Sequence, residues 1–223
     1  MGSKFKLSNE KPSLKELFFP SRCIICRDIQ PPAVSICPGC ARNLSATGSQ
    51  SKFRGDFFDG GYAPFFYEEP LRESFLRFKF RSRPQYSRQF GKWMANCLAA
   101  QEEAPFDFVT WCPLNLLRKL ERGYDQAQLL ADEVGRQLSL PVVSTLKKDY
   151  RTPLSSIEGN KAIRSAHIMG AYTLRRGVNV AERRILLIDD VVTSGSTMSE
   201  CARILKTAGA REVVCLSLMR RRG

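Results

Sequence analysis

One stretch constrains the fold more than any other. ILLIDDVVTSGST, residues 185–197, runs from four apolar residues into two adjacent acids and then into a loop of small hydroxyl residues around one glycine. A short, continuous apolar run is typical of a strand buried on both faces of a parallel sheet. In open α/β sheets, ligands bind at the carboxyl ends of such strands, so Asp189 and Asp190 are predicted to face a ligand.

The loop after the acids has the composition of a phosphate site. It consists of Thr193, Ser194, Gly195, Ser196 and Thr197. Residues 196–208 are predicted to form a helix, and the backbone N–H groups at a helix N-terminus bind phosphate well, together with small hydroxyl side chains. Gly195 has no Cβ, so the backbone can approach the anion closely.

The two acids are expected to contact a different part of the ligand, because carboxylates repel a phosphate. Sugar hydroxyls and a bound Mg²⁺ both fit, and a pentose 5-phosphate offers hydroxyls to the acids and phosphate to the loop. The Walker B strand of a nucleotide hydrolase also carries acids, but it requires a G-x4-G-K-[ST] loop that this sequence lacks. A receiver domain clusters acids without a TSGST turn after them. A purely structural strand end stays open as an alternative.

Strand and helix patterns alternate along the rest of the chain, which predicts an α/β domain with a mostly parallel, doubly wound sheet flanked by helices. Helical spacing of apolar residues covers 71–80, 90–98 and 127–138, the last with Asp125 as the candidate N-cap. Strands are predicted at 107–112, 141–146, 185–188 and 213–219. Residues 147–170 show no period and are expected to form a lid loop, and residues 45–61 a linker or an exposed hairpin.

Eight cysteines occur, and four of them form two Cys-x2-Cys pairs separated by ten residues: Cys23, Cys26, Cys37 and Cys40. This spacing is typical of a structural, tetrahedral zinc site, with two disulfides or an iron–sulfur cluster as alternatives. Four thiolates leave no open coordination position, so we expect the zinc to fold this segment and to take no part in catalysis. The chain is thus predicted to comprise a tail (1–20), a four-cysteine zinc unit (21–44) and the α/β domain (45–223).

Lys and Arg outnumber Asp and Glu by 35 to 22, a formal net charge of +13, which favours polyanionic partners such as phosphorylated metabolites or nucleic acid. A solvated basic surface is the alternative. No apolar run approaches the roughly 18–20 residues that span a bilayer, so we expect a soluble, cytoplasmic protein without membrane insertion.

Several segments together resemble the ComF family of competence proteins. Pro113-Leu114, Arg118 and the segment RGYDQA (122–127) are similar to that family's P-x-P…R-G-[FY]-N-Q-A, and residues 164–172 are similar to R-x2-N-x2-G-A-F. The ILLIDDVVTSGST stretch resembles the signature of type I phosphoribosyltransferases, and the four-cysteine unit is shared too. The resemblance covers about residues 18–220. Asp125 and His167 stand where the family usually has Asn, and no Gln follows Pro153.

This resemblance implies a ligand, phosphoribosyl pyrophosphate (PRPP) with Mg²⁺, and a phosphoribosyltransferase activity on an unknown acceptor during DNA uptake or natural transformation. It implies that Asp189 and Asp190 hold the ribose hydroxyls and that residues 193–197 bind the 5-phosphate. The turn Pro113, Leu114 and Asn115 would face the pyrophosphate, helped by Arg118, Lys119 or Arg122. Arg122 lies inside the family motif and, as a bidentate donor, suits an oxyanion better than lysine does. A lone histidine such as His167 is more often a surface or packing residue.

The second hypothesis is a non-catalytic module that binds single-stranded DNA or proteins of the competence machinery. Arg77, Lys79, Arg81 and Arg83 alternate with Phe78 and Phe80 and precede Tyr86, a mixture that single-strand binders use. The same phenylalanines also fit a buried helical stripe. Residues 220–222, three consecutive arginines, are a further candidate for phosphate contact.

Overall fold

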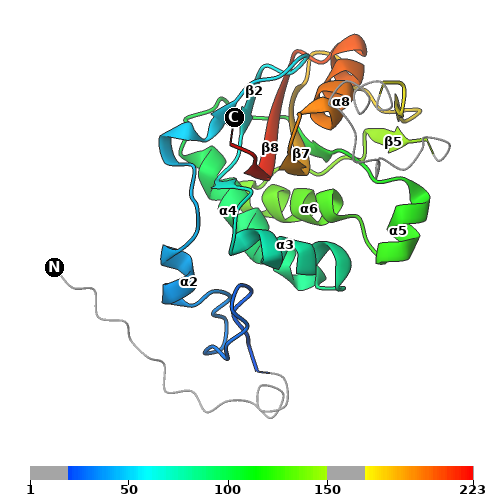
Figure 1. The fold of residues 1–223 in the computed structure, drawn as a ribbon. Helices are drawn as coiled ribbons and strands as arrows, with labels where there is room; N and C mark the ends of the chain where they lie inside the picture. Colours follow the sequence, from blue (N-terminus) through cyan, green and yellow to red (C-terminus); the bar gives the residue numbers. More distant parts are fainter. Residues whose placement is uncertain (1–19, 150–168, 223) are drawn as a thin grey trace. The chain divides into compact units, whose positions relative to one another are not determined.

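The computed structural model describes residues 20–149 and 169–222. The chain divides into two compact units, Met1–Leu44 and Ser45–Gly223 (Figure 1). In the first unit the main secondary-structure element is the short helix α2, Pro38–Arg42, whose first residue is a proline with its φ preset for a helix. Among the described residues of this unit, turns lie at 24–26 and 32–33.

The second unit is built on a mostly parallel sheet. Its strands lie in the order β1-β2-β8-β7-β4, with β3 also paired to β8. Their bounds are Lys52–Phe53 (β1), Gly60–Tyr62 (β2), Phe65–Phe66 (β3), Phe108–Trp111 (β4), Arg184–Val192 (β7) and Glu212–Arg220 (β8). Only β1 runs antiparallel to its neighbour; the other pairs in this sheet are parallel. The predicted parallel sheet is therefore confirmed.

Strand β7 carries the ILLIDD stretch and lies between β4 and β8, so both its edges are hydrogen-bonded and Ile185 to Ile188 are fully buried. Thr110 of β4 pairs with Leu187, and Trp111 with Ile188. Because the pairing is parallel, the carboxyl ends of β4 and β7 open at the same edge of the sheet. The two acids in the carboxyl-terminal half of β7 and the turn that follows β4 are thereby brought together.

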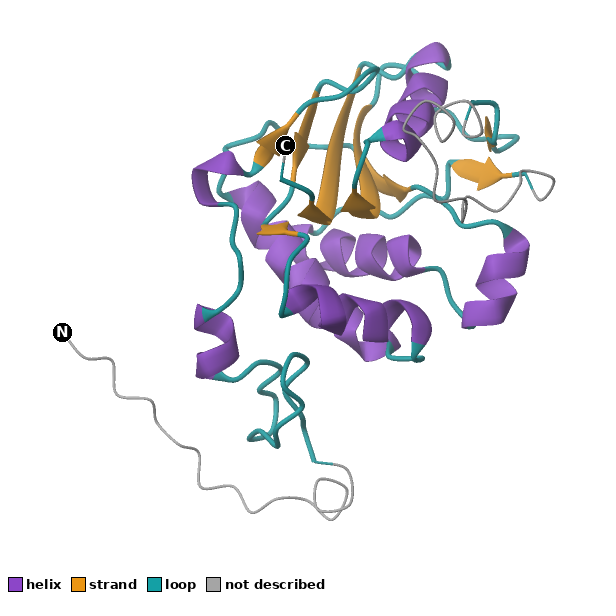
Figure 2. Ribbon diagram, in the orientation of Figure 1, coloured by secondary structure: helices purple, strands orange, loops and turns teal. Residues whose placement is uncertain are grey.

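Helices cover both faces of this sheet, as Figures 1 and 2 show. They are α3 (Leu71–Phe80), α4 (Ser87–Ala99) and α6 (Gln126–Leu138) on one face, and α8 (Ser196–Thr207) on the other. Alternate residues of β7 face opposite sides of the sheet. Ile185 and Leu187 pack in the same core cluster as Met198 and Leu205 of α8. The prediction for α6 is confirmed in detail, since Asp125 accepts a hydrogen bond from the Gln128 N–H at 3.3 Å as its N-cap.

A second, two-stranded antiparallel sheet contains β5 (Leu146–Lys148) and β6 (Tyr172–Leu174). The strand predicted at 141–146 is wrong: only Val142 bridges to Val109, and the segment then leaves β4 to pair with β6. The apolar pattern did not reveal this change of partner, because it shows that a residue is buried without showing against which strand. Residues 147 and 148, expected in a loop, belong to β5. The rest of the predicted lid, including His167, lies almost entirely outside the described residues.

Residues 45–61 are only partly a linker, because β1 and β2 form a hairpin within them. β2 adds to the sheet alongside β8, and its Tyr62 is buried. Within the described parts of the chain, none of the helices combines the length and the apolar character that crossing a membrane requires.

Candidate functional site

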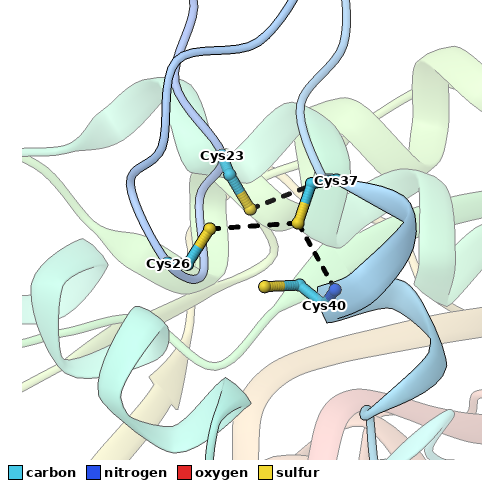
Figure 3. Close-up of side chains that lie close together, drawn as sticks. All are labelled: Cys23, Cys26, Cys37 and Cys40. Atoms are coloured by element: carbon cyan, nitrogen blue, oxygen red, sulfur yellow. Dashed lines mark hydrogen bonds between the residues drawn. The ribbon is translucent and has the colours of Figure 1, made fainter.

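The four paired cysteines of the first unit converge on one point (Figure 3). Their Sγ atoms all lie within 4.8 Å of one another, and those of Cys26 and Cys37 are 3.9 Å apart. Tetrahedral zinc with Zn–S bonds of about 2.3 Å places its sulfurs about 3.8 Å apart, so the four side chains fit this ion. None of the four forms a disulfide. The predicted cluster is confirmed as a group that could hold zinc.

Backbone N–H groups support thiolate ligands at this cluster. The Cys37 N–H donates to the Cys23 sulfur, and the Cys40 N–H to the Cys37 sulfur, each at 3.4 Å. Burial would raise the pKa of Cys23, but hydrogen bonds from the backbone, led by that of Cys37, lower it to about 7. A thiol that loses its proton near neutral pH is a suitable zinc ligand.

A cavity of about 330 Å³ opens at the carboxyl ends of β4 and β7 in the second unit. Among the predicted site residues, it is lined by Asp189, Asp190, Pro113, Leu114, Asn115, Arg118, Arg122, Thr193, Ser194 and Thr197. Gly195 and Ser196 line a small adjoining hollow of about 30 Å³ beside the same loop. The structure thus brings the residues predicted for the ligand site to one place, although they come from segments about 70 residues apart; the exception is Lys119, which is not in the lining and instead donates to the Gln128 side chain at 3.2 Å.

The two acids at the end of β7 have different surroundings. The Asp189 carboxylate accepts a hydrogen bond from the Asp190 N–H at 2.8 Å. Burial, together with the negative charge of Asp190, raises the pKa of Asp189 to about 8. Asp190 instead lies 3.5 Å from the Lys79 ammonium of α3. At neutral pH the site can therefore hold the Asp189 carboxyl largely protonated, beside an Asp190 that is paired with Lys79.

The hydroxyl loop opens helix α8. Gly195 is the N-cap with φ = 76°, a left-handed conformation that glycine adopts without strain. It supplies no capping side chain, so the first turn of α8 is available to an anion. The Ser194 and Ser196 hydroxyls lie 2.8 Å apart and form a hydrogen bond across this turn.

The turn after β4 is held by Asp125. One carboxylate oxygen accepts the Leu114 N–H at 2.9 Å, and the other accepts the Gln128 N–H that caps α6. Asn115 then caps the short helix α5, Leu116–Arg122, by accepting the Arg118 N–H at 2.9 Å. In both contacts Asp125 acts as the hydrogen-bond acceptor. Aspartate can therefore make them at this motif position, although it lacks the amide donor that asparagine would add.

Comparisons with known proteins agree with this geometry. Residues 125–223 match the phosphoribosyl transferase domain family. Competence protein F of Haemophilus influenzae is 26% identical over 226 residues, which cover 91% of this chain and 98% of that protein. Competence protein ComFC of Streptococcus pneumoniae is 28% identical over 158 residues, 71% of this chain and 67% of that protein. The resemblance to ComF competence proteins is confirmed. The DNA utilization protein YhgH of Escherichia coli K12 is 30% identical over 114 residues, 51% of this chain and 49% of that protein.

Solved structures with a similar fold include phosphoribosyltransferases. Glutamine PRPP amidotransferase from B. subtilis matches with a TM-score of 0.43 and 22% identity, over 63% of this chain but only 30% of that chain. Purine phosphoribosyltransferase from Pyrococcus horikoshii matches with a TM-score of 0.35 and 14% identity, over 59% of this chain and 71% of that chain. The family match over residues 125–223 supports a type I phosphoribosyltransferase-like α/β domain in this ComF-like chain, and a four-cysteine cluster lies near its N-terminus.

The cationic wall of the pocket is larger than the ComF motif indicates. Arg122 lies over the ring of Phe80 at 5.0 Å and donates to the side-chain Oε1 of Gln126 at 3.0 Å. Three further cations line the pocket: Arg221, Lys79, already described, and Lys148, whose ammonium lies 5.0 Å from the centre of the Tyr172 ring. Burial lowers the pKa of Lys148.

Several residues that line the pocket were not predicted to belong to the ligand site. They are Tyr67, Phe75, Lys79, Cys112, Lys148, Tyr172, Val191 and Arg221. Tyr172 was the most accessible to prediction, because it lies in the ComF-like G-A-[FY] segment. Tyr67 and Phe75 carry no such signal, since an aromatic residue beside a buried helix stripe is typical of core packing.

The basic and aromatic stretch 77–86 buries two of its three aromatic residues. Phe78 is fully buried, and Arg77 and Tyr86 are 5% and 8% exposed, as the interpretation as a buried stripe predicts. Phe80 differs, because 61% of its surface is exposed. Of the aromatic residues in this stretch, only Phe80 is therefore accessible to a nucleobase.

Proposed function

We propose that this chain binds PRPP with Mg²⁺ in the pocket at the carboxyl ends of β4 and β7 and transfers its phosphoribosyl group to an acceptor, as part of DNA uptake or natural transformation. The observation that carries the proposal is the convergence of two acids, an uncapped hydroxyl loop and a cationic wall in one cavity of about 330 Å³. That volume is at the lower end for small-molecule sites, which suits a phosphorylated sugar. The names of the competence relatives support the biological role.

Each part of PRPP has a complementary group in this arrangement. Asp189 and Asp190 accept hydrogen bonds from the ribose hydroxyls, and the loop 193–197 binds the 5-phosphate. The pyrophosphate lies toward the turn 113–115, where Arg118 and Arg122 offset its charge. Anionic oxygens are thus kept away from the two acids, which removes the repulsion that a phosphate beside them would cause.

Mg²⁺ suits the oxygen-rich donor set of this pocket. The ion favours one or two carboxylates together with substrate phosphates and waters, and the two acids of β7 are the carboxylates that line the cavity. Bound with the diphosphate, Mg²⁺ would reduce the negative charge that develops as pyrophosphate leaves.

The residues of the chain act mainly by position and charge in this scheme. The acids fix the ribose, the loop fixes the 5-phosphate, and Arg122 and Arg118 stabilise the leaving pyrophosphate as the sugar acquires oxocarbenium character. Arg122 is suited to this role because stacking on Phe80 and the bond to Gln126 hold its guanidinium in place.

The proposal extends to the organisation of the chain and its location. Residues 21–44 form a structural zinc unit, and residues 45–223 form the transferase-like domain. None of the eight cysteines forms a disulfide, which supports a reducing, cytoplasmic location.

Calorimetric titration of PRPP with Mg²⁺ tests the ligand. We expect micromolar binding to the wild type, and loss of binding in an Asp189→Asn/Asp190→Asn variant and in an Arg122→Ala variant. An Asp56→Asn variant, altered at an exposed acid, should bind like the wild type. Absence of binding to the wild type would refute the ligand, and release of pyrophosphate on addition of a candidate acceptor would establish the reaction.

A second candidate is a non-catalytic module that binds single-stranded DNA or competence-machinery proteins. The net charge of +13 and the exposed Arg81 beside Phe80 favour it, whereas burial of Phe78 and Tyr86 removes two of the three stacking surfaces. Fluorescence anisotropy with a labelled oligothymidylate at rising salt tests direct DNA binding. Affinity that falls steeply with salt would support phosphate contacts, and no binding at low salt would exclude this form of the hypothesis.

A further inference from the structure

Helix α3 is apolar on two sides, and only one of them packs against the protein core. Leu71, Phe75 and Phe78 are buried on the inner side. On the outer side Leu76 and Phe80 follow each other at a spacing of four residues, which places them on one face of the helix. Leu76 is half-buried and Phe80 is 61% exposed. A large exposed apolar side chain beside a second one is typical of a recognition surface.

Two hollows lie on either side of Phe80. One, of about 340 Å³, is lined by Glu73, Leu76, Arg77, Phe80 and Arg81. The other, of about 300 Å³, is lined by Lys79, Phe80, Ser82, Arg118, Glu121 and Arg122. Phe80 forms the ridge between them, and we call the two hollows with this ridge the Phe80 surface.

The Phe80 surface is strongly basic. It contains five cations, Arg77, Lys79, Arg81, Arg118 and Arg122, and two acids, Glu73 and Glu121. One acid is already engaged, because Glu73 pairs with Arg77 at 2.6 Å. The remaining excess of positive charge favours an occupant that carries carboxylates or phosphates. The apolar ridge favours one with aliphatic or aromatic side chains.

We propose that the Phe80 surface docks an acidic, amphipathic segment of another protein, most simply a helix with apolar residues four positions apart and carboxylates beside them. Such a helix seats an apolar side chain in the hollow between Leu76 and Phe80 and places its carboxylates near Arg81 and the cations of the second hollow.

Charge and geometry disfavour the other occupants. A second copy of this chain would present the same basic surface, in a protein of net charge +13, and would be repelled. Single-stranded nucleic acid binds through successive aromatic faces, whereas only Phe80 is exposed here. The Phe80 ring is also approached by Arg122 at 5.0 Å and by Lys79 at 5.9 Å, which compete with a stacking base.

Docking at this surface would reach the ligand pocket, because three residues belong to both. Lys79, Arg118 and Arg122 line the second hollow and the pocket at the end of β7. A partner carboxylate near Lys79 would compete with Asp190, which lies 3.5 Å from its ammonium. The proposal concerns the docking surface itself and does not depend on which ligand occupies the pocket.

Selection from a displayed library of random helical peptides against the full-length protein tests the proposal. We expect enrichment of acidic peptides with apolar residues four positions apart. Their affinity, measured by fluorescence anisotropy with labelled peptides, should fall roughly tenfold or more in Phe80→Ala and Leu76→Ala variants, the loss typical of a central anchor. Arg81→Glu should weaken the same peptides, and a labelled oligothymidylate serves as the nucleic-acid probe.

Matched controls separate specific docking from general attraction. Phe57→Ala removes another exposed phenylalanine, and Arg176→Glu reverses another exposed arginine, so neither should change peptide affinity. Enrichment without an excess of acids, binding that is unchanged by Phe80→Ala, or no enrichment would each overturn the proposal. Oligothymidylate binding that depends on Phe80, without peptide binding, would assign the surface to nucleic acid and also overturn it.

Discussion

Replacement of Asp189 by asparagine is expected to stabilise the protein and at the same time to abolish ligand binding. Burial and the charge of Asp190 raise the pKa of Asp189 from 3.8 to about 8, so its ionised form is unfavourable in the folded protein. Asparagine has nearly the same shape and can still accept the Asp190 N–H, which donates to Asp189 at 2.8 Å. It removes the buried charge and adds an amide donor in its place.

The size of the effect depends on pH. A carboxyl whose pKa is raised on folding contributes stability below its unfolded pKa, and this contribution is lost as the pH rises through its folded pKa. A rise from 3.8 to about 8 corresponds to at most about 6 kcal/mol. Asp189 keeps some contact with solvent, which screens the charge, so we expect the substitution to stabilise the protein by about 1–3 kcal/mol at pH 8.5. At pH 5.5 the gain should be smaller, because the wild-type carboxyl is then largely protonated.

Urea denaturation at pH 5.5, 7.0 and 8.5 measures this difference in the free energy of unfolding, with the fluorescence of Trp93 and Trp111 as the signal. Calorimetry with PRPP and Mg²⁺ on the same samples should show that binding is lost. The exposed Asp56→Asn variant should match the wild type in both assays. An Asp189→Asn variant that is less stable than the wild type at pH 8.5, or whose gain does not grow with pH, would refute the reasoning.

Three further predictions test other parts of the molecule. Cys37→Ser should release the zinc that we expect to bind in a one-to-one ratio, which elemental analysis of the purified protein measures; equal zinc content in variant and wild type would argue against the site. Lys79→Met should weaken binding of PRPP with Mg²⁺ about tenfold by removing a cation from the pocket wall, as measured by calorimetry; an unchanged dissociation constant would remove Lys79 from the site. Tyr124→Phe should lower the free energy of unfolding by about 1–2 kcal/mol, because the Tyr124 hydroxyl donates to the Phe78 carbonyl and accepts the Arg83 N–H. Urea denaturation measures this difference, and an unchanged free energy of unfolding would show that these hydrogen bonds contribute little.

Local sequence patterns were sufficient to predict the strand and the helix that hold the site residues. The apolar run before Asp189 is long enough for a strand and too short for a helix, and Gly195 marks the point where the chain turns into α8. The cysteine spacing likewise predicted a cluster, because two Cys-x2-Cys turns can present four thiolates to one ion. In each of these cases the controlling interactions lie within a few residues of one another.

The path of residues 141–148 could not be predicted in the same way. The apolar pattern of this segment is compatible with a strand in either sheet, and pairing decides between them: Val142 bridges to Val109, whereas Leu146 pairs with Leu174. The position of Lys79 is a similar case. Its helix was predicted, but its pairing with Asp190 depends on how α3 packs over the end of β7.

Residue types and short spacings alone revealed the chemical groups of this protein: an acid pair, a hydroxyl loop, a four-thiol cluster and an excess of positive charge. Those features follow from residue type and short spacing, which the chain carries in any conformation. The tertiary structure alone decided which residues meet. It buried Asp189 beside Asp190, brought Lys79 and Lys148 to the pocket and left Phe80 exposed between two hollows, because packing among distant segments sets distance, burial and local charge.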